Sequence, residues 1–175
     1  MKIVLFFILC FLISCTNKVI PIKGDYLKLP FQIETDKKFD EVWSNLIDLF
    51  AQKGLPIKII DKSSGLIISE NGELTYTIEL DNGKLKNKDA FIVVPKIYNP
   101  GSRKIYPINS YMQSSEPIYG EWNIRIKTVD NKTMINVNIV NVFYSYYLGA
   151  HIYKQPLTDY KSTGVFENLI AQTIK

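Results

Sequence analysis

Few side chains in this sequence could carry out covalent or acid–base chemistry. There is one histidine, His151, and there are two cysteines, Cys10 and Cys15. A catalytic histidine pair, a Cys/His metal site or a disulfide framework would each need more of these residues. No serine lies in a G-x-S-x-G motif, and there is no glycine-rich phosphate loop. The sequence therefore argues against an enzyme and predicts neither a metal nor a cofactor.

The remaining candidates for chemistry have simpler explanations. His151 lies among several tyrosines, where we expect a packed or surface histidine, although a functional role stays open. Asp40 and Glu41 fall on the polar side of an expected helix, which favours a solvated helix face over an acid–base pair. The net charge of +4 is too small and too scattered to indicate nucleic-acid binding.

Tyrosine is the residue type whose clustering suggests binding. The chain has 11 tyrosines, and residues 143–147 are Phe-Tyr-Ser-Tyr-Tyr. Tyrosine combines a large contact area with a polar tip and is common at protein interfaces. We therefore predict a binding surface, the alternative being that these rings belong to the core and rim of a sheet. The candidate residues are Tyr98, Tyr106, Tyr111, Tyr144, Tyr146 and Tyr147.

The N-terminal residues have the pattern of a secretory signal. Met1 and Lys2 precede an uninterrupted apolar run over residues 3–13. At about 1.5 Å per residue, a helix of this length is shorter than the ~30 Å hydrocarbon core of a bilayer, which argues against a transmembrane helix. A basic start followed by a short apolar core favours a signal peptide, the alternative being a buried N-terminal strand or helix.

The residues after this run resemble the bacterial lipobox. Leu12-Ile13-Ser14-Cys15 has a branched apolar residue, two tolerant positions and the obligatory cysteine, directly after the apolar core. The resemblance implies that residues 1–14 are a lipoprotein signal peptide cut before Cys15, and that Cys15 carries a diacylglyceryl group and an acylated amine. More than one acyl chain gives stable membrane anchoring. Thr16 in place of aspartate implies, by the same resemblance, an outer-membrane location facing the periplasm.

The mature chain fits one domain. The full sequence has 175 residues and is 46% hydrophobic, which indicates a single globular fold. Residues 15–29, which contain proline and glycine and lack clean periodicity, are expected to form a lipidated tether. Residues 30–175 are expected to form the domain. Within it, the proline-rich stretch 84–117 predicts a long loop, which is either a partner-contacting region or a variable surface insertion.

Apolar spacing predicts the elements of the domain. Residues 39–50 have apolar residues at three-four spacing, and Gly54 and Pro56 end this helix. Short strands are expected at 31–34, 57–60, 66–69 and 74–80, a long hairpin at 119–129 and 133–143, and a last helix after residues 162–164. The expected fold class is α+β, a single antiparallel β-sheet packed against two helices, because this arrangement would bury every apolar stripe.

Part of the domain resembles a known family. The residues are Phe39-x-x-Val42-Trp43 on the expected helix, then Gly54-Leu55-Pro56-Ile57, then Asp61-Lys62-Ser63-Ser64-Gly65-Leu66-Ile67. This pattern is similar to the repeated domain of the NlpB/BamC-type lipoproteins of the outer-membrane β-barrel assembly machinery. The resemblance implies a helix-grip-like fold, in which a curved antiparallel sheet holds a long helix, and an outer-membrane assembly context.

Together these patterns predict a membrane-anchored lipoprotein that acts as a non-catalytic binding or accessory module with an envelope protein partner. The alternative is a periplasmic carrier that holds a small apolar ligand between helix and sheet. The two hypotheses place different demands on the core. A carrier needs a cavity lined by Trp43, Phe50 and the strand of Trp122, whereas a binding module needs a filled core and exposed tyrosines.

Overall fold

The computed structural model describes residues 16–110, 117–148 and 150–175. Two of the predicted site residues, Cys15 and Tyr111, lie outside this part of the chain, as does the side chain of Tyr147. The predicted signal peptide, residues 1–14, lies outside it as well. None of the described helices is long and apolar enough to cross a bilayer.

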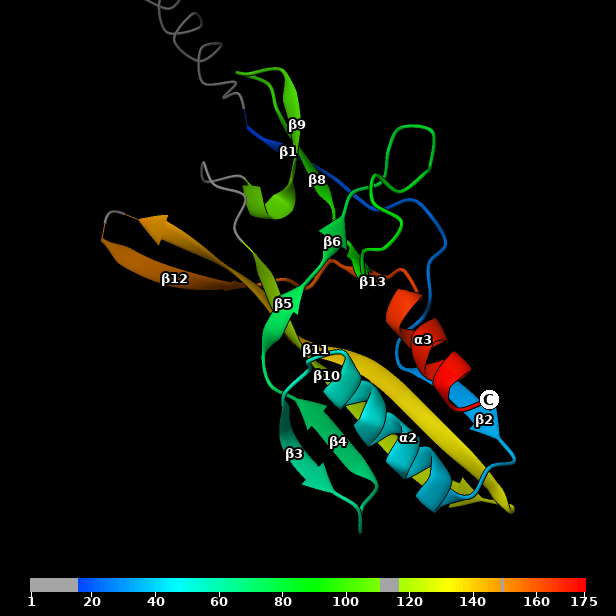
Figure 1. The fold of residues 1–175 in the computed structure, drawn as a ribbon. Helices are drawn as coiled ribbons and strands as arrows, with labels where there is room; N and C mark the ends of the chain where they lie inside the picture. Colours follow the sequence, from blue (N-terminus) through cyan, green and yellow to red (C-terminus); the bar gives the residue numbers. More distant parts are fainter. Residues whose placement is uncertain (1–15, 111–116, 149) are drawn as a thin grey trace, which may run out of the picture.

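The largest sheet has seven strands and is built around one long hairpin, β10 (Ile118–Val129) and β11 (Lys132–Leu148) (Figure 1). The other strands are β2 (Phe31–Thr35), β3 (Ile57–Asp61), β4 (Leu66–Ser69), β5 (Gly72–Leu74) and β12 (His151–Pro156). The sheet order is β12-β11-β10-β4-β3, with β2 paired to β11 and β5 paired to β10. Each of these pairings is antiparallel.

The alternation of side chains explains why the long hairpin forms. Trp122 and Ile126 are buried on one face of β10, whereas Arg125 is exposed on the other face. Asp130 and Asn131 make the connecting turn with φ of 50° and 63°, left-handed values that these residue types tolerate. The hairpin lies where its alternation predicts, and β11 continues further along the chain than the predicted strand.

Two small sheets lie beside the large one. The first joins β1 (Lys18–Ile20), β8 (Lys96–Asn99) and β9 (Lys104–Pro107) in the order β1-β8-β9. The second joins β13 (Lys161–Ser162), β7 (Ile92–Val93) and β6 (Tyr76–Thr77), and its β6–β7 pair is parallel. The predicted fold, a single antiparallel β-sheet packed against two helices in a helix-grip-like arrangement, is therefore wrong. The described chain is mostly β, with three sheets and two α-helices.

Most strands of the small sheets are missed by the sequence patterns for a physical reason, although β6 falls within the strand expected at 74–80. Their strands are two to four residues long and pair with segments far away in the chain, β1 with β8 and β13 with β7. Strands this short have no periodicity of their own, so tertiary pairing decides them. The stretch 84–117, predicted as a loop, contains β7, β8, β9 and the 3-10 turn Ile108–Ser110.

The two helices, α2 (Phe39–Gln52) and α3 (Val165–Thr173), complete the core. The α2 helix matches its prediction and ends at Gln52, and Gly54 just beyond it has φ of 62°, which suits a residue without a side chain. Its buried face is Val42, Trp43, Leu46, Leu49 and Phe50. Phe166 of α3 lies between this helix and the sheet, with its ring centroid 6.2 Å from Phe50 and 3.9 Å from Trp122. The Phe166 ring of α3 is thus packed between α2 and the large sheet.

Candidate functional site

The end of β11 and the whole of β12 form a hairpin that extends away from the rest of the sheet (Figure 1). We call residues 143–156 the aromatic hairpin. All six residues of β12 are exposed, and β12 is the edge strand of the seven-stranded sheet. The backbone N–H and C=O groups on the side of β12 that faces away from β11 therefore pair with no further strand of this sheet. An edge strand of this kind is a template for pairing with another chain.

One face of the aromatic hairpin carries a row of rings. The strand register places Tyr146 opposite Tyr153, and Tyr144 lies two residues from Tyr146 on the same face. The ring centroids of Tyr144 and Tyr146 are 6.5 Å apart, and Tyr146 and Tyr153 are stacked at 5.5 Å. His151 extends the row, with its ring 6.4 Å from that of Tyr153. These four side chains form a continuous aromatic surface.

The opposite face of the hairpin carries both apolar side chains and a charged group. Ile152 is 61% exposed, a high value for a large aliphatic side chain. Lys154 places its ammonium group 4.7 Å from the centre of the Phe143 ring, and Phe143 stacks on Tyr119 at 5.5 Å. Exposed aromatic and aliphatic groups beside few charges are typical of the central part of a protein interface.

Burial affects the pKa of Tyr144, one of the four residues of this row. The pKa of Tyr144 is raised by burial and by the neighbouring Tyr146. Its phenol therefore stays protonated at neutral pH and is available as a hydrogen-bond donor. Tyr153 at the other end of the row is 43% exposed. The row can thus offer ring faces and phenol hydroxyls to a partner.

The structure brings together only some of the predicted tyrosines. Tyr144 and Tyr146 share the aromatic hairpin, and the backbone of Tyr147 pairs with Ile152 there. Tyr98 and Tyr106 lie instead in the sheet β1-β8-β9. Because Tyr106 pairs with Ile97, the neighbour of Tyr98, the two tyrosines lie on opposite faces of that sheet. Sequence reasoning missed Ile152 and Tyr153, although their place just after the tyrosine cluster was a usable signal.

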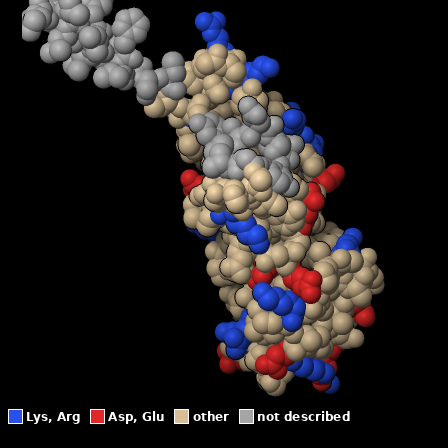
Figure 2. Space-filling view, turned by 90° about the vertical axis from the view of Figure 1, so that its left-hand side faces the viewer, with Lys and Arg blue, Asp and Glu red and all other residues tan. Residues whose placement is uncertain are grey.

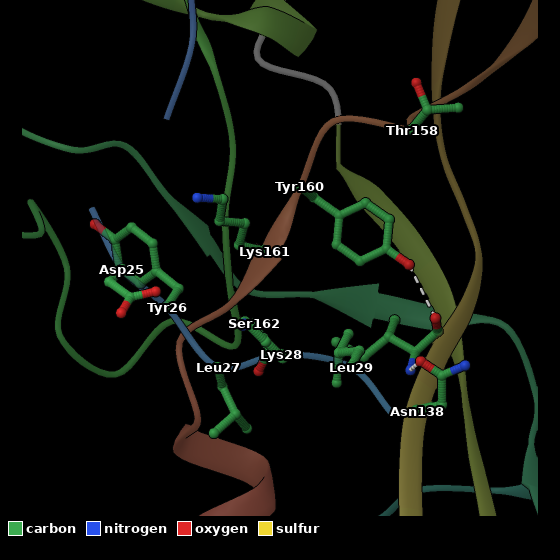
Figure 3. A pocket seen from close by; sticks show the side chains of 11 residues that line it. Asp25, Tyr26, Leu27, Lys28, Leu29, Asn138, Thr158, Tyr160, Lys161 and Ser162 are labelled. Carbon is green, nitrogen blue, oxygen red and sulfur yellow. Dashed lines mark hydrogen bonds between the residues drawn. The ribbon is translucent and has the colours of Figure 1, made fainter. Parts of the chain in front are cut away.

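A separate pocket of about 570 Å³ opens where the N-terminal segment, residues 16–29, runs along the domain (Figure 3). Tyr160 closes one side, and its hydroxyl donates to the carbonyl of Ile139 at 2.9 Å. Lys161 donates to the carbonyl of Gly24 at 3.0 Å and lies over the ring of Tyr26. The lining residues are Asp25, Tyr26, Leu27, Lys28, Leu29, Asn138, Ile139, Thr158, Tyr160, Lys161 and Ser162. This pocket is shallow and mixed in character, and its best-defined polar groups already bond to the protein.

The carboxylate of Glu79 fixes the N-terminal segment to the domain. Its oxygens accept hydrogen bonds from the backbone N–H of Lys23 at 3.0 Å, the N–H of Gly24 at 2.8 Å and the hydroxyl of Tyr26 at 3.2 Å. Burial alone would raise the pKa of Glu79, but these three bonds and the charge of Lys96 lower it below its ordinary value. The pKa of Tyr26 is raised to about 12 by burial and by Glu79. The arrangement is structural, because both carboxylate oxygens hold the N-terminal segment.

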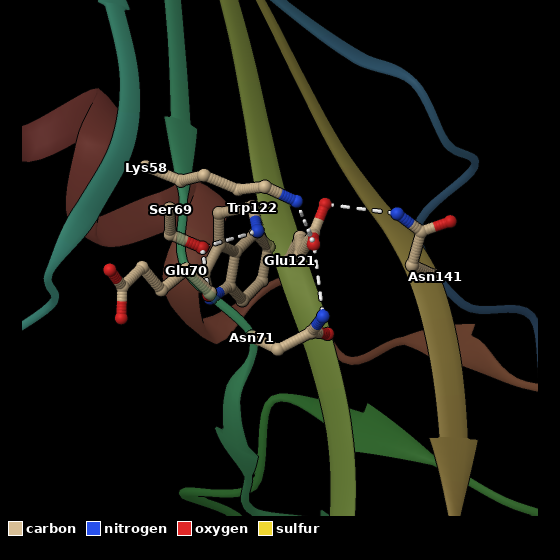
Figure 4. A network of polar contacts seen from close by, with 7 residues as sticks. All are labelled: Lys58, Ser69, Glu70, Asn71, Glu121, Trp122 and Asn141. Atoms are coloured by element: carbon tan, nitrogen blue, oxygen red, sulfur yellow. Dashed lines mark hydrogen bonds and ion pairs between the residues drawn. The ribbon is translucent and has the colours of Figure 1, made fainter. Parts of the chain in front are cut away.

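Glu121 is a second buried carboxylate with a structural role (Figure 4). One of its oxygens accepts from Lys58 at 3.0 Å and from Asn71 at 2.9 Å, and the other accepts from Asn141 at 2.9 Å. These partners come from β3, from the segment between β4 and β5, and from β11. Glu121 therefore joins four neighbouring parts of the large sheet, and both of its oxygens are occupied.

Among the described residues, neither a metal cluster nor the carrier cavity expected around Trp43, Phe50 and Trp122 is found. Within the described ranges, no group of three or more His, Cys, Asp or Glu side chains could hold a metal ion. The rings of Trp43, Phe50 and Trp122 are all buried in one core, with Phe166 filling the space between helix and sheet. None of those three residues lines the pocket of Figure 3. Comparison of the chain with protein-family models and with curated proteins gives no match.

Proposed function

We propose that this protein is a lipid-anchored, non-catalytic binding module of the bacterial cell envelope that engages a protein partner through its aromatic hairpin. The anchor is Cys15, and the location is the outer membrane facing the periplasm, as the lipobox resemblance implies. The observation that carries the proposal is the aromatic row at the sheet edge, in which the half-buried Tyr146 stacks on the exposed Tyr153 of β12 and His151 of β12 is exposed beside it. No catalytic constellation accompanies it among the described residues.

Three properties of the hairpin support a protein partner. Large exposed apolar side chains such as Ile152 are costly in water and mark interaction sites when they cluster. Tyrosine is among the residues that contribute most to interface binding energy. The free edge of β12 offers main-chain hydrogen bonds to an extended segment of the partner, which would add a strand to the sheet.

The filled core favours this function over the carrier hypothesis. A carrier would need room between α2 and the sheet, where the rings of Phe166 and Trp122 instead approach to 3.9 Å. A ligand there would have to displace Phe166, which is buried. A filled core beside a hairpin whose Ile152 and Tyr153 are exposed is the arrangement expected of a binding module, with Tyr144 and Tyr146 half-buried behind them.

Site-specific photo-crosslinking in the cells that make the protein tests the proposal. A photoreactive residue in place of Ile152 should form a crosslink to one envelope protein. The same residue in place of Lys127, which is exposed on β10 away from the hairpin, should not. Replacing Tyr146 and Tyr153 by alanine should abolish the crosslink from position 152 without changing the circular-dichroism spectrum. A processed, folded protein that crosslinks equally from both positions, or from neither, would contradict the proposed site.

The anchor is tested separately. The Cys15→Ala variant should incorporate no lipid label and should accumulate as an unprocessed precursor. Normal maturation and membrane retention of this variant would rule out the lipoprotein assignment and leave the hairpin proposal to the crosslinking result.

A further inference from the structure

One end of the sheet β1-β8-β9 is positively charged. Lys18 of β1, Lys104 of β9 and Arg103 in the turn between β8 and β9 are all exposed, and we call these three residues the basic tip. The fourth cation of the sheet, Lys96, pairs with Asp81 at 3.2 Å. Residues 16–24 and 95–107 contain no aspartate or glutamate. Figure 2 shows Lys and Arg side chains and no acidic ones over the uppermost part of this face.

The strand register brings the basic tip to the point where the chain enters the fold. Lys18 pairs with Tyr98, and Asn99 pairs with Lys104, so Lys18 and the turn lie at the same end of the sheet. Because β1 is antiparallel to β8, residues 16 and 17 also lie at this end. The basic tip is therefore the part of the described domain closest along the chain to Cys15.

Chain length sets how far the basic tip can lie from an acylated Cys15. Lys18 is three residue steps from Cys15, and an extended chain spans at most about 3.6 Å per step, or roughly 11 Å. The Debye length at physiological ionic strength is about 8 Å, so a fully extended link would leave Lys18 largely screened, whereas a shorter path would bring it within range of an anionic surface. A lipid anchor at Cys15 thus keeps the basic tip close enough to reach the membrane.

The side chains around the basic tip suit the headgroup region of a bilayer. Val19 is 49% exposed and Ile105 is 43% exposed, and the register places them on opposite faces of the sheet. Tyr98 and Tyr106 also lie one on each face and are half-buried. Tyrosine is enriched at membrane–water interfaces, and apolar groups on both faces permit edge-on entry of the tip among the headgroups.

From these placements we propose that the basic tip docks on anionic phospholipid headgroups and orients the domain on the membrane that holds its anchor. The inference rests on the lipid anchor of the proposed function and goes beyond it, because an anchor alone fixes attachment and not orientation. Each cation near an anionic bilayer strengthens binding about fivefold, so three cations change the ratio of docked to free tip about a hundredfold.

A depth measurement on the mature lipidated protein tests the docking. With Cys15 acylated and Cys10 removed with the signal, Ser102→Cys introduces a single thiol at the basic tip, where Ser102 is exposed. Thr128→Cys at the exposed far end of β10 is the matched control. Each variant is labelled with a fluorophore and reconstituted into vesicles whose headgroups carry a quencher. One set of vesicles is phosphatidylcholine alone, and the other also contains phosphatidylglycerol.

The label at position 102 should be strongly quenched in phosphatidylglycerol vesicles and released by high salt. The combined substitutions Lys18→Gln, Arg103→Gln and Lys104→Gln should also release it, and the label at position 128 should be unaffected throughout. Equal quenching at positions 102 and 128, or equal quenching in both kinds of vesicle, would overturn the docking.

Mass spectrometry of the N-terminal peptide separates the two proposals. An acylated Cys15 with an unquenched label at position 102 would refute the docking and leave the anchor intact. A chain that is not acylated would refute the anchor proposal. The docking proposal, which rests on the anchor, would then be refuted as well.

Discussion

Replacing Glu79 by glutamine should loosen the N-terminal segment without changing the size of the buried side chain. In the native structure one carboxylate oxygen accepts from Gly24 N–H and Tyr26 O–H, and the other accepts from Lys23 N–H. Glutamine keeps one carbonyl oxygen for the first two donors. Its amide group then faces the N–H of Lys23, so a donor meets a donor and the hydrogen bond is lost.

The magnitude follows from the burial of the site. Glu79 is 7% exposed, so a donor left without an acceptor beside it costs about 1–3 kcal/mol. The two remaining bonds also lose their charge assistance. We expect Glu79→Gln to lower the free energy of unfolding by about 2 kcal/mol, which for a domain of this size is a fall of roughly 4–8 °C in melting temperature. Tyr26→Phe removes only one bond and should cost about 1 kcal/mol.

The pKa shift of Glu79 also predicts the direction in which stability changes with pH. The pKa of Glu79 is lower in the folded protein than its ordinary value of 4.5. The stabilisation by Glu79 is therefore fully present above the unfolded-state pKa and is lost as the pH falls through the lower folded-state pKa. Wild-type protein should release the N-terminal segment at acid pH, whereas Glu79→Gln should show no such transition in that segment.

Amide hydrogen exchange reports the result residue by residue. The amides of Lys23 and Gly24 should exchange faster in Glu79→Gln than in the wild type. The amide of Leu27, which donates to Ser162 at 3.2 Å without involving Glu79, is the internal control. If the Lys23 and Gly24 amides exchange at wild-type rates in the variant, the reasoning about Glu79 is refuted.

Four further substitutions test other parts of the fold by urea unfolding. Gly65→Ala should cost about 3 kcal/mol or more, because Gly65 has φ of 68° and an added Cβ would lie 2.0 Å from the carbonyl oxygen of Ile126. Gly54→Ala is the matched control. Gly54 has φ of 62° but open space around an added Cβ, so this substitution should cost only about 1 kcal/mol. Phe166→Ala should cost about 3–5 kcal/mol through the cavity it leaves, and a smaller loss would mean that helix and sheet close over the gap. Burial raises the pKa of Glu167, so stability should fall as the pH rises through that raised value, and Glu167→Gln should remove this dependence.

Long periodic segments could be predicted from the sequence. The spacing from Phe39 to Phe50 predicts α2, and the alternation around Trp122 predicts the β10–β11 hairpin. Both patterns extend over ten or more residues, so local sequence alone determines which face is buried. The end of β11 was harder to predict, because beyond residue 143 the side chains are tyrosines that suit either a core or a surface.

The contacts that shape the candidate sites could not be predicted in this way. Glu79 is an ordinary acidic residue in the sequence, and its partners lie more than fifty positions earlier in the chain. Strand β1 has three residues and no turn signal, and only pairing with β8 makes it a strand. Such contacts depend on the tertiary arrangement, to which local propensity contributes little. The edge position of β12 likewise follows from sheet order rather than from its own residues.

The N-terminal segment decides whether a lipid anchor would tether the domain loosely or hold it in one orientation. A free chain spanning residues 15–29 would have an end-to-end distance of about 20 Å and would leave the aromatic hairpin pointing in any direction. In the structure, β1 pairs with β8, Glu79 binds the backbone at Lys23 and Gly24, and Leu27 bridges to Ser162. Only residues 16 and 17 separate Cys15 from the first of these attachments. An anchored protein would therefore hold its domain close to the membrane and restrict the directions open to the hairpin, and docking of the basic tip would select one of them, which a freely tethered module could not do.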